Sequence, residues 1–296
     1  MLNNKILITG CCGFVGRNIT AFLKKKKFII DGIGHGNWNK KTYKSWGYNF
    51  LVNKKINFKN LITLNENYNY IIHCGGTGLQ SKSMESFKKN ITTLQEVLEY
   101  IIKKNKKIKL IFISSVAVNA KKKIIEENLD HNPISNYGLN KQLCEDIIKF
   151  YSNKYQLDSL ILRVTSLYGN DLKKQFIYDA CKKLRNNKNI FLGKGDEIRD
   201  WLHINDFCNL IYKILIKEFN KFNIMNCGSG ENYSIKYILN LLCKLFKIKI
   251  IPKFNSEGVE NNPIRLIPRI KKIKRYHWKP KISIYKGLRR YVLQFK

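Results

Sequence analysis

The chain lacks any uncharged apolar run approaching the roughly 20 residues that a bilayer-spanning helix needs. Runs such as Leu110–Val118 are far too short. Its amino-terminal end also lacks an apolar stretch of signal-peptide length, because Ile6–Ile8 leads directly into a glycine turn. We therefore expect a cytoplasmic protein that is not attached to a membrane.

Paired cysteine motifs are missing too. The sequence holds 8 cysteines but no CxxC pair, and Cys11 and Cys12 are adjacent. This spacing suits neither a zinc site nor a disulfide framework. We expect reduced thiols, as in the cytosol, and no bound metal.

Acidic residues are scarce: 21 Asp and Glu face 55 Lys and Arg, for a formal charge of +34. Such a charge raises the possibility of nucleic-acid binding, because clustered cations bind phosphates by releasing counterions. The cations are mostly lysines in runs such as Lys24–Lys27 and Lys121–Lys123, where helix ends or turns are expected. We interpret them as solvated surface and do not expect a nucleic-acid partner, although the positive field would attract an anionic substrate.

What the chain does have is an alternation of short apolar runs with longer amphipathic ones, which is typical of α/β proteins. The pattern predicts a doubly wound parallel (Rossmann) sheet over residues 1–166. Residues 167–296 are predicted to form a smaller, mixed C-terminal substrate lobe, of which about 205–230 returns to the main sheet. The strands expected in the first part are Lys5–Thr9, Phe28–Gly34, Phe50–Val52, Tyr70–Cys74, Lys109–Ser114 and Ser159–Thr165, with helices Val15–Lys25, Met84–Lys103 and Tyr137–Tyr155. In the second part we expect helices Phe176–Leu184, Asn205–Lys217 and Ile235–Phe246, and extended segments Ile224–Asn226 and Ile248–Ile251.

The first predicted strand ends in a GxxGxxG turn that opens a helix. Its glycines permit a tight turn, let the backbone approach a pyrophosphate, and let the helix pack closely on the strand. The free N–H groups at the helix amino terminus then favour the phosphates. The turn therefore predicts a dinucleotide site formed by Gly10, Gly13, Phe14, Val15 and Gly16.

The end of the second strand bears on the choice between NAD and NADP. An acid there usually binds the adenosine ribose 2′-hydroxyl and repels a 2′-phosphate. In this chain Gly34 takes that place, His35 follows, Lys40 and Lys41 are close, and Asp31 lies earlier, inside the strand. The pattern favours NADP, with His35 as a cofactor contact, and leaves NAD open.

Three residues form a candidate catalytic set. Tyr137 and Lys141 are four apart and so project from one face of a helix. Tyrosine is a poor base at neutral pH unless its phenolate is stabilised, and an ammonium one turn away stabilises it. Lys141 can also bind the nicotinamide ribose. Ser115, at the carboxyl end of the fifth predicted strand, can hold the substrate oxygen that exchanges a proton.

With these motifs in place, the chain resembles, over nearly its whole length, the extended short-chain dehydrogenase/reductases of the sugar-nucleotide epimerase/dehydratase group. The matching segments are Gly10–Gly16, Ile71–Gly76, Ser114–Ser115, Tyr137–Lys141, Arg163–Gly169, Arg199–Asp206, Asn226–Gly230 and Trp278–Leu288.

The resemblance implies further roles. Arg199 would bind the diphosphate of a nucleotide-sugar substrate, a task suited to a planar, permanently charged fork. His203 and Asp206 would be structural, and His73 a packing residue. The helices 84–103 and 137–155 resemble the four-helix contact of a homodimer. The acid that often holds the adenine after the third strand is absent from Asn53–Lys55.

Departures from the group narrow the chemistry. Val116 and Ala117 stand where the 4,6-dehydratases carry an Asp-Glu pair, and Val116 stands where GDP-fucose synthases carry a cysteine. Simple hydride transfer at C4 remains. We favour a 4-ketoreductase acting on a nucleotide 4-keto-6-deoxy sugar. The alternative is a nucleotide-sugar 4-epimerase that holds NAD tightly, and a third possibility is a non-catalytic NAD(P)-sensing or RNA-binding member.

Overall fold

A computed structural model of the protein describes residues 4–36, 40–64, 67–76, 84–128, 130–257 and 262–295. The chain divides into two compact units. The first unit comprises Met1–Ser115, Asn136–Arg163 and Cys208–Met225, and the second comprises Val116–Ser135, Val164–Phe207 and Asn226–Lys296. The assignment of residues 1–166 to the cofactor and 167–296 to the substrate stays a prediction.

The first unit is built around a seven-stranded parallel sheet, as the sequence predicted. Its strand order is β10-β6-β5-β4-β1-β2-β3. The strands are β1 (Lys5–Thr9), β2 (Ile29–Gly34), β3 (Phe50–Asn53), β4 (Tyr70–His73), β5 (Lys109–Ser115), β6 (Ser159–Val164) and β10 (Asn223–Cys227). The chain winds outward from β1 in one direction to β3 and in the other direction from β4 to β6. The order therefore reverses between β1 and β4, which is where open α/β sheets bind ligands.

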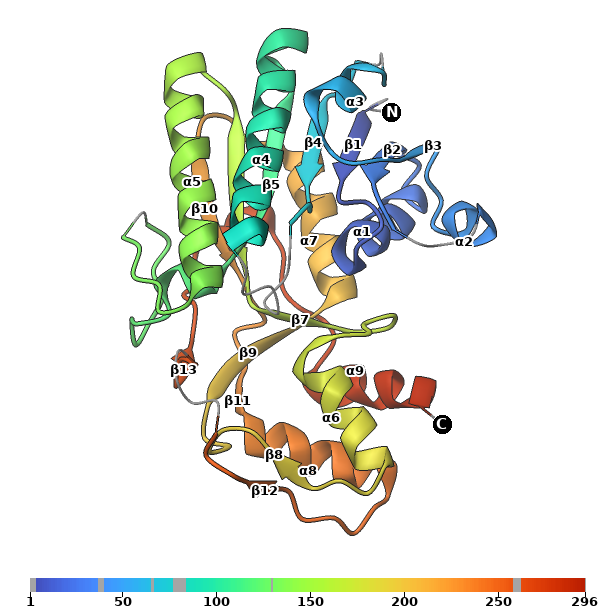
Figure 1. Ribbon diagram of the computed structural model, residues 1–296, viewed down its shortest axis with the longest axis vertical. Helices are drawn as coiled ribbons and strands as arrows, with labels where there is room; N and C mark the ends of the chain where they lie inside the picture. Colours follow the sequence, from blue (N-terminus) through green and yellow to red (C-terminus); the bar gives the residue numbers. More distant parts are fainter. Residues whose placement is uncertain are drawn as a thin grey trace. The chain divides into compact units, whose positions relative to one another are not determined.

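Helices flank this sheet. They are α1 (Phe14–Lys24), α2 (Lys40–Ser45), α3 (Phe58–Ile62), α4 (Met84–Lys104), α5 (Asn136–Tyr155) and α7 (Ile204–Lys217). α4 and α5 lie side by side (Figure 1), and α1 contacts α7 through the rings of Phe22 and Tyr212, whose centroids are 6.4 Å apart. Among the described residues, none of the helices is both long and apolar enough to span a bilayer.

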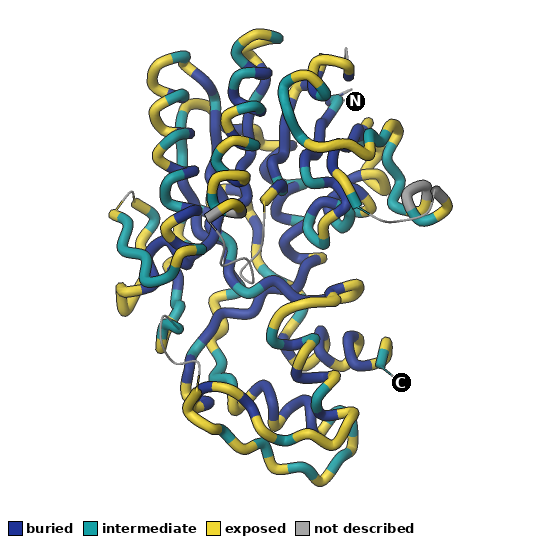
Figure 2. The backbone as a smooth tube through the Cα atoms, in the orientation of Figure 1, coloured by how far each residue is buried: buried dark blue, intermediate teal, exposed yellow. Residues whose placement is uncertain are grey.

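The core of the first unit lies along the central strands, which are buried on both faces (Figure 2). Continuous apolar runs such as Ile6–Ile8 and Leu110–Ile113 form these strands because a parallel sheet covered by helices has no solvated face. The buried face of α5 is different, since it carries polar residues: Asn140, Lys141, Glu145 and Ser152.

The second unit has smaller sheets. Strands β11 (Asn232–Ser234), β9 (Ile198–His203), β13 (Arg265–Leu266) and β7 (Ser166–Tyr168) form one, and β8 (Ile190–Phe191) pairs with β12 (Lys253–Phe254). Its remaining α-helices are α6 (Gln175–Arg185), α8 (Ile235–Phe246) and α9 (Ile284–Tyr291). Residues 248–251, which we expected to be extended, lie between α8 and β12 and belong to neither. α8 ends at Phe246, Lys247 takes a left-handed conformation with φ 59°, and the strand that follows is β12.

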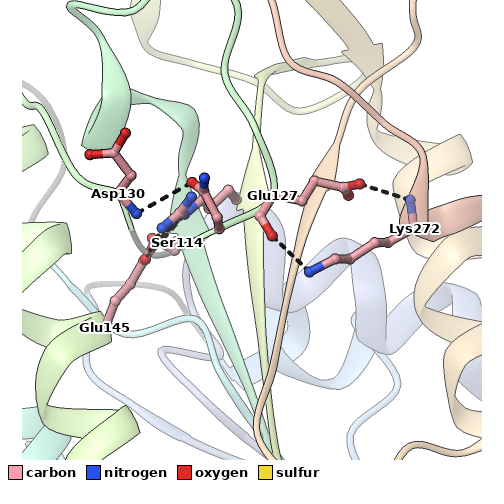
Figure 3. A network of polar contacts seen from close by, with 7 residues as sticks. Ser114, Glu127, Asp130, Glu145 and Lys272 are labelled. Carbon is pink, nitrogen blue, oxygen red and sulfur yellow. Dashed lines mark hydrogen bonds and ion pairs between the residues drawn. The ribbon is translucent and has the colours of Figure 1, made fainter.

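Residues 116–135 belong to the second unit because they are bonded to its carboxyl-terminal segment. The Glu127 carboxylate accepts the backbone N–H groups of Asn226 (3.0 Å) and Lys272 (2.8 Å), and Lys272 Nζ donates to the Glu127 carbonyl (2.7 Å; Figure 3). Ile125 adds a parallel bridge to Pro268. The two bonds of the Glu127 carboxylate thus join residues that are 99 and 145 positions apart in the sequence.

Candidate active site

The glycine turn has the shape of a phosphate cradle. Gly10 has φ +72°, and a Cβ there would lie 2.5 Å from the backbone nitrogen of Gly75, so only glycine fits between the ends of β1 and β4. A Cβ at Gly16 would lie 2.8 Å from the Gly10 carbonyl oxygen, so a side chain would push α1 off the turn.

The start of α1 is suited to an anion. Gly13 is its N-cap residue and has no side chain to accept the first N–H groups, and the first turn contains no acid. Phe14, Val15 and Gly16 are the first three helical residues, so their N–H groups have no partner within the helix. A dinucleotide pyrophosphate fits this donor set, and these residues would hold it.

Asp31, inside β2, is bonded within the protein and is not placed to bind a cofactor ribose. Asp31 is 2% exposed, accepts the Tyr68 hydroxyl at 2.9 Å and pairs with Lys5 at 3.3 Å. It is therefore a structural carboxylate within the strand. Gly34 is buried, and a Cβ on it would lie 3.1 Å from the Cys11 nitrogen.

His35, the next residue, is exposed. The Asn53 side chain bonds both backbone groups of Gly36, at 3.1 and 3.3 Å, so it fixes the turn after β2. Lys41 is exposed, and the Lys40 side chain lies outside the described residues.

The three candidate catalytic residues lie on two adjoining segments of the first unit. Ser115 is the last residue of β5 and is 9% exposed. Tyr137 and Lys141 lie in the first two turns of α5, where Tyr137 is half-buried and Lys141 is 8% exposed. Lys141 Nζ donates to the Ile113 carbonyl at 2.9 Å, two residues before Ser115, so the lysine is fixed against the end of β5.

His73, at the end of β4, is a neutral packing residue. Its Nδ1 lies 2.6 Å from Thr9 Oγ1, and its ring stacks on Phe112 with centroids 5.7 Å apart. Burial, and to a lesser extent the Lys141 ammonium, lower the pKa of His73 to about 3. An imidazole that stays neutral at physiological pH and is fully enclosed can support the site but cannot act as its acid.

Sequence reasoning missed Tyr48. Its hydroxyl donates to the Cys11 carbonyl at 2.9 Å, and its ring would lie 2.7 Å from a Cβ at Gly32. Tyr48 thus holds the backbone of the glycine turn in place at Cys11. It sits in an irregular segment between α2 and β3, where no spacing or motif marks it.

Arg199 lies in β9 of the second unit and is 8% exposed. Its guanidinium donates to the Asn262 amide oxygen (2.7 Å) and to the carbonyls of Ile198 (2.8 Å) and Ile264 (3.4 Å). All three acceptors are neutral. Burial lowers the pKa of Arg199 to about 10, opposed by Glu197. A buried cation held by neutral oxygens is suited to receive an anion.

The other polar residues of this stretch hold the second unit together. The Asp206 carboxylate accepts the backbone N–H groups of Lys281 and Ile282, at 3.0 and 2.8 Å, and Trp278 Nε1 donates to the Asp206 carbonyl at 3.1 Å. His203 packs edge-on against Tyr168, and burial lowers its pKa to about 4. Within the described residues, no group of three or more His, Cys, Asp or Glu side chains could hold a metal ion.

Comparisons with known proteins show which family and which relatives this chain is similar to. The model of the NAD dependent epimerase/dehydratase family matches residues 6–228. A UDP-glucuronate 4-epimerase of Thermodesulfobacterium geofontis is 27% identical over 306 residues, which cover 97% of this chain and 94% of that relative. A GDP-6-deoxy-D-talose 4-dehydrogenase of Aggregatibacter actinomycetemcomitans is 24% identical over 270 residues, which cover 88% of this chain and 86% of that relative.

Among solved structures, the fold is similar to that of a UDP-glucuronic acid 4-epimerase from Bacillus cereus, determined in complex with UDP-glucuronic acid and NAD. The TM-score is 0.87 at 24% identity, and the match covers 99% of this chain and 100% of that one.

Proposed function

The chain belongs to the NAD dependent epimerase/dehydratase family, and on that premise we propose that it is a nucleotide-sugar 4-epimerase that keeps NAD bound. Membership confirms the resemblance found in the sequence and makes the chain an enzyme, which disfavours a non-catalytic sensor or RNA-binding protein. The observation that carries the proposal is its similarity, over 97% of its length, to a relative named a 4-epimerase. The 4-ketoreductase favoured by the sequence becomes the second candidate.

The chain's own residues supply the proton chemistry. Tyr137 takes the proton of the C4 hydroxyl, and Lys141 lies one helical turn away on the same side of α5. Ser115 holds the same sugar oxygen by a hydrogen bond. When bound, NAD supplies a reversible hydride acceptor for C4. The 4-keto sugar then rotates so that its other face is presented. Tyr137 returns the proton to the C4 oxygen, which gives the opposite C4 epimer.

Binding is assigned to both units. Gly10, Gly13, Phe14, Val15 and Gly16 hold the dinucleotide pyrophosphate, and Lys141 binds the nicotinamide ribose. In the second unit, the buried Arg199 guanidinium receives the diphosphate of the nucleotide sugar, because its described hydrogen bonds go to neutral oxygens.

NAD replaces NADP as the proposed cofactor, because the solved relative described above was determined with NAD. One observation keeps the 4-ketoreductase with NADPH as second candidate: the acid beside the adenosine ribose is absent at Gly34, and the exposed His35 follows it. The relative named a 4-dehydrogenase shows that similar chains are assigned to redox chemistry at C4.

We extend the proposal to a cytoplasmic homodimer. The eight cysteines carry free thiols, which suits a reducing compartment. α4 and α5 would form the dimer contact, and α5 bears the exposed apolar residues Leu139 (40%) and Phe150 (59%). Sedimentation of Phe150→Glu should show a monomer where the unaltered chain shows a dimer.

The test is to identify the cofactor that co-purifies and then to follow turnover. An epimerase should carry NAD by mass spectrometry and interconvert C4 epimers of a UDP-sugar with no added cofactor. Tyr137→Phe should keep the NAD and lose most turnover. Empty protein that oxidises added NADPH with a 4-keto-6-deoxy nucleotide sugar would establish the reductase instead.

A further inference from the structure

The inner face of α5 carries a buried charge network that the proposed chemistry does not use. The Glu145 carboxylate accepts the Ser114 hydroxyl at 2.5 Å and the Arg163 guanidinium at 2.6 Å from Nη2 and 3.1 Å from Nε. Figure 3 shows Ser114 and Glu145 facing one another. Arg163 and Glu145 are fully buried, and Ser114 is 1% exposed.

This network joins the two segments that carry the candidate catalytic residues. Glu145 lies one helical turn after Lys141 and two turns after Tyr137, so all three project from one side of α5. On β5, Ser114 directly precedes Ser115, and Ile113 accepts the Lys141 ammonium. Two successive turns of α5 are thus bonded to successive residues of β5.

Fixing Ser114 has a direct effect on Ser115. Ser115 follows Ser114 directly as the last residue of β5, so a bond that holds Ser114 also holds the stretch of backbone that carries the Ser115 side chain. Arg163, on the neighbouring strand β6, in turn fixes the Glu145 carboxylate through a two-pronged contact. Apolar side chains of similar volume would fill the same space without setting these directions.

We propose that Glu145, held by Arg163, is a positioning residue that sets the Ser115 hydroxyl against Tyr137 and Lys141. This inference rests on the proposed function. It assigns no proton transfer to Glu145, whose carboxylate is enclosed by its partners.

The main test variant is Ser114→Ala, which removes a single hydroxyl and keeps the Glu145–Arg163 pair. Misplacing a reacting group costs turnover far more than binding, so kcat should fall roughly 10- to 100-fold while the KM of the UDP-sugar stays within about twofold. Ser114→Thr, which restores a hydroxyl, should recover most of the kcat. The double variant Arg163→Met with Glu145→Leu should keep its fold and NAD and lose kcat to a similar extent.

Lys109→Met is the matched control. Lys109 lies at the opposite end of the same strand and contacts Glu218, Phe219 and Asn220. Its loss should lower the melting temperature without changing kcat. An unchanged kcat in Ser114→Ala, or a kcat loss in Lys109→Met equal to that in Ser114→Ala, would overturn the positioning role.

Amide hydrogen exchange separates this inference from the proposed function. Ser114→Ala should speed exchange in peptides covering residues 112–117 and 137–145, and Lys109→Met should leave residues 137–145 protected. If the unaltered protein turns over no nucleotide sugar, the proposed function fails and the exchange data still decide the coupling. Unchanged protection of both peptides in Ser114→Ala would refute the coupling between β5 and α5, and with it the positioning role of Glu145.

Discussion

Two buried arginines, one in each unit, are held in different ways. Arg163 in the first unit is fully buried and pairs with the Glu145 carboxylate. Arg199 in the second unit is almost as buried, at 8% exposed, but its hydrogen bonds go to an amide oxygen and two backbone carbonyls. Each guanidinium has given up most of its hydration, but only Arg163 is hydrogen-bonded to a carboxylate among the contacts described, whereas Glu197 acts on Arg199 through its charge alone.

The difference separates a structural charge from a functional one. Burying a cation costs several kcal/mol unless an opposite charge offsets the lost hydration. For Arg163 the chain supplies that charge, so the pair can serve to orient its neighbours. For Arg199 the offset is incomplete, and a substrate diphosphate would complete it. The same residue type at similar burial therefore has two roles, which its partners decide.

The sharpest way to break the comparison is Arg163→Ala. It leaves the Glu145 carboxylate buried without its guanidinium, and loss of one partner of a buried pair costs about 3–5 kcal/mol. Urea unfolding should record a loss of that size, while Arg163→Met combined with Glu145→Leu recovers much of it. A single variant as stable as the unaltered chain would show that Arg163 is not the compensating charge.

Arg199→Met should behave in the opposite way. Removing a cation that only neutral oxygens hold should leave the free energy of unfolding unchanged or raise it. Charge-assisted hydrogen bonds contribute about 1.5–3 kcal/mol, so the KM of the nucleotide sugar should rise roughly 10- to 100-fold. Arg199→Lys keeps the charge but loses the planar fork, so its KM should lie between that of the unaltered chain and that of Arg199→Met. Initial rates and calorimetric binding of UDP measure the effect, and a stability loss with unchanged KM would contradict it.

Each unit also buries a neutral histidine. The folded-state pKa values of His73 and His203 are lowered from 6.5 to about 3 and about 4, mainly by burial. The unfolded chain therefore takes up protons first as the pH falls, and stability present above pH 6.5 is lost progressively below it. Each histidine should remove about 2 kcal/mol between pH 6.5 and pH 5.

Unfolding at several pH values measures this slope, and His73→Asn, which can keep the bond to Thr9, should flatten it. A slope identical to that of the unaltered chain would mean that His73 is protonated in the folded state.

The smallest expected effect is that of Asn262→Ala. It removes the 2.7 Å amide acceptor that orients the Arg199 guanidinium and leaves the guanidinium itself in place. The KM of the nucleotide sugar should rise roughly two- to tenfold at nearly constant kcat, by initial-rate kinetics. A fall in kcat alone would place Asn262 elsewhere in the mechanism.

Much of the first unit follows from local pattern. The predicted strand Lys5–Thr9 and helix Met84–Lys103 match β1 and α4 to within a residue. A short, continuous apolar run predicts a strand buried on both faces, and the glycine turn marks where α1 begins. The Tyr137–Lys141 spacing likewise needed only the period of a helix.

The second unit was less predictable. Its short strands gain their stability from pairing with distant segments, as β9 does with β11 and β13. The segment Ile248–Ile251 holds three isoleucines and one lysine, a composition typical of strands, but it pairs with none of the described strands. Lys253–Phe254 pairs with β8 instead. Composition cannot encode a partner that lies sixty residues away.

The sequence by itself determined the class of fold, the glycine cradle and the Tyr–Lys pair, because each depends on residues within one or two turns of each other. Only the tertiary structure decided that Glu145 meets Arg163 and Ser114, that Asp31 belongs to the core, and that Arg199 is held by neutral oxygens. Such facts depend on which distant groups share a low-dielectric interior, and the energy of a charge there is fixed by its neighbours in space.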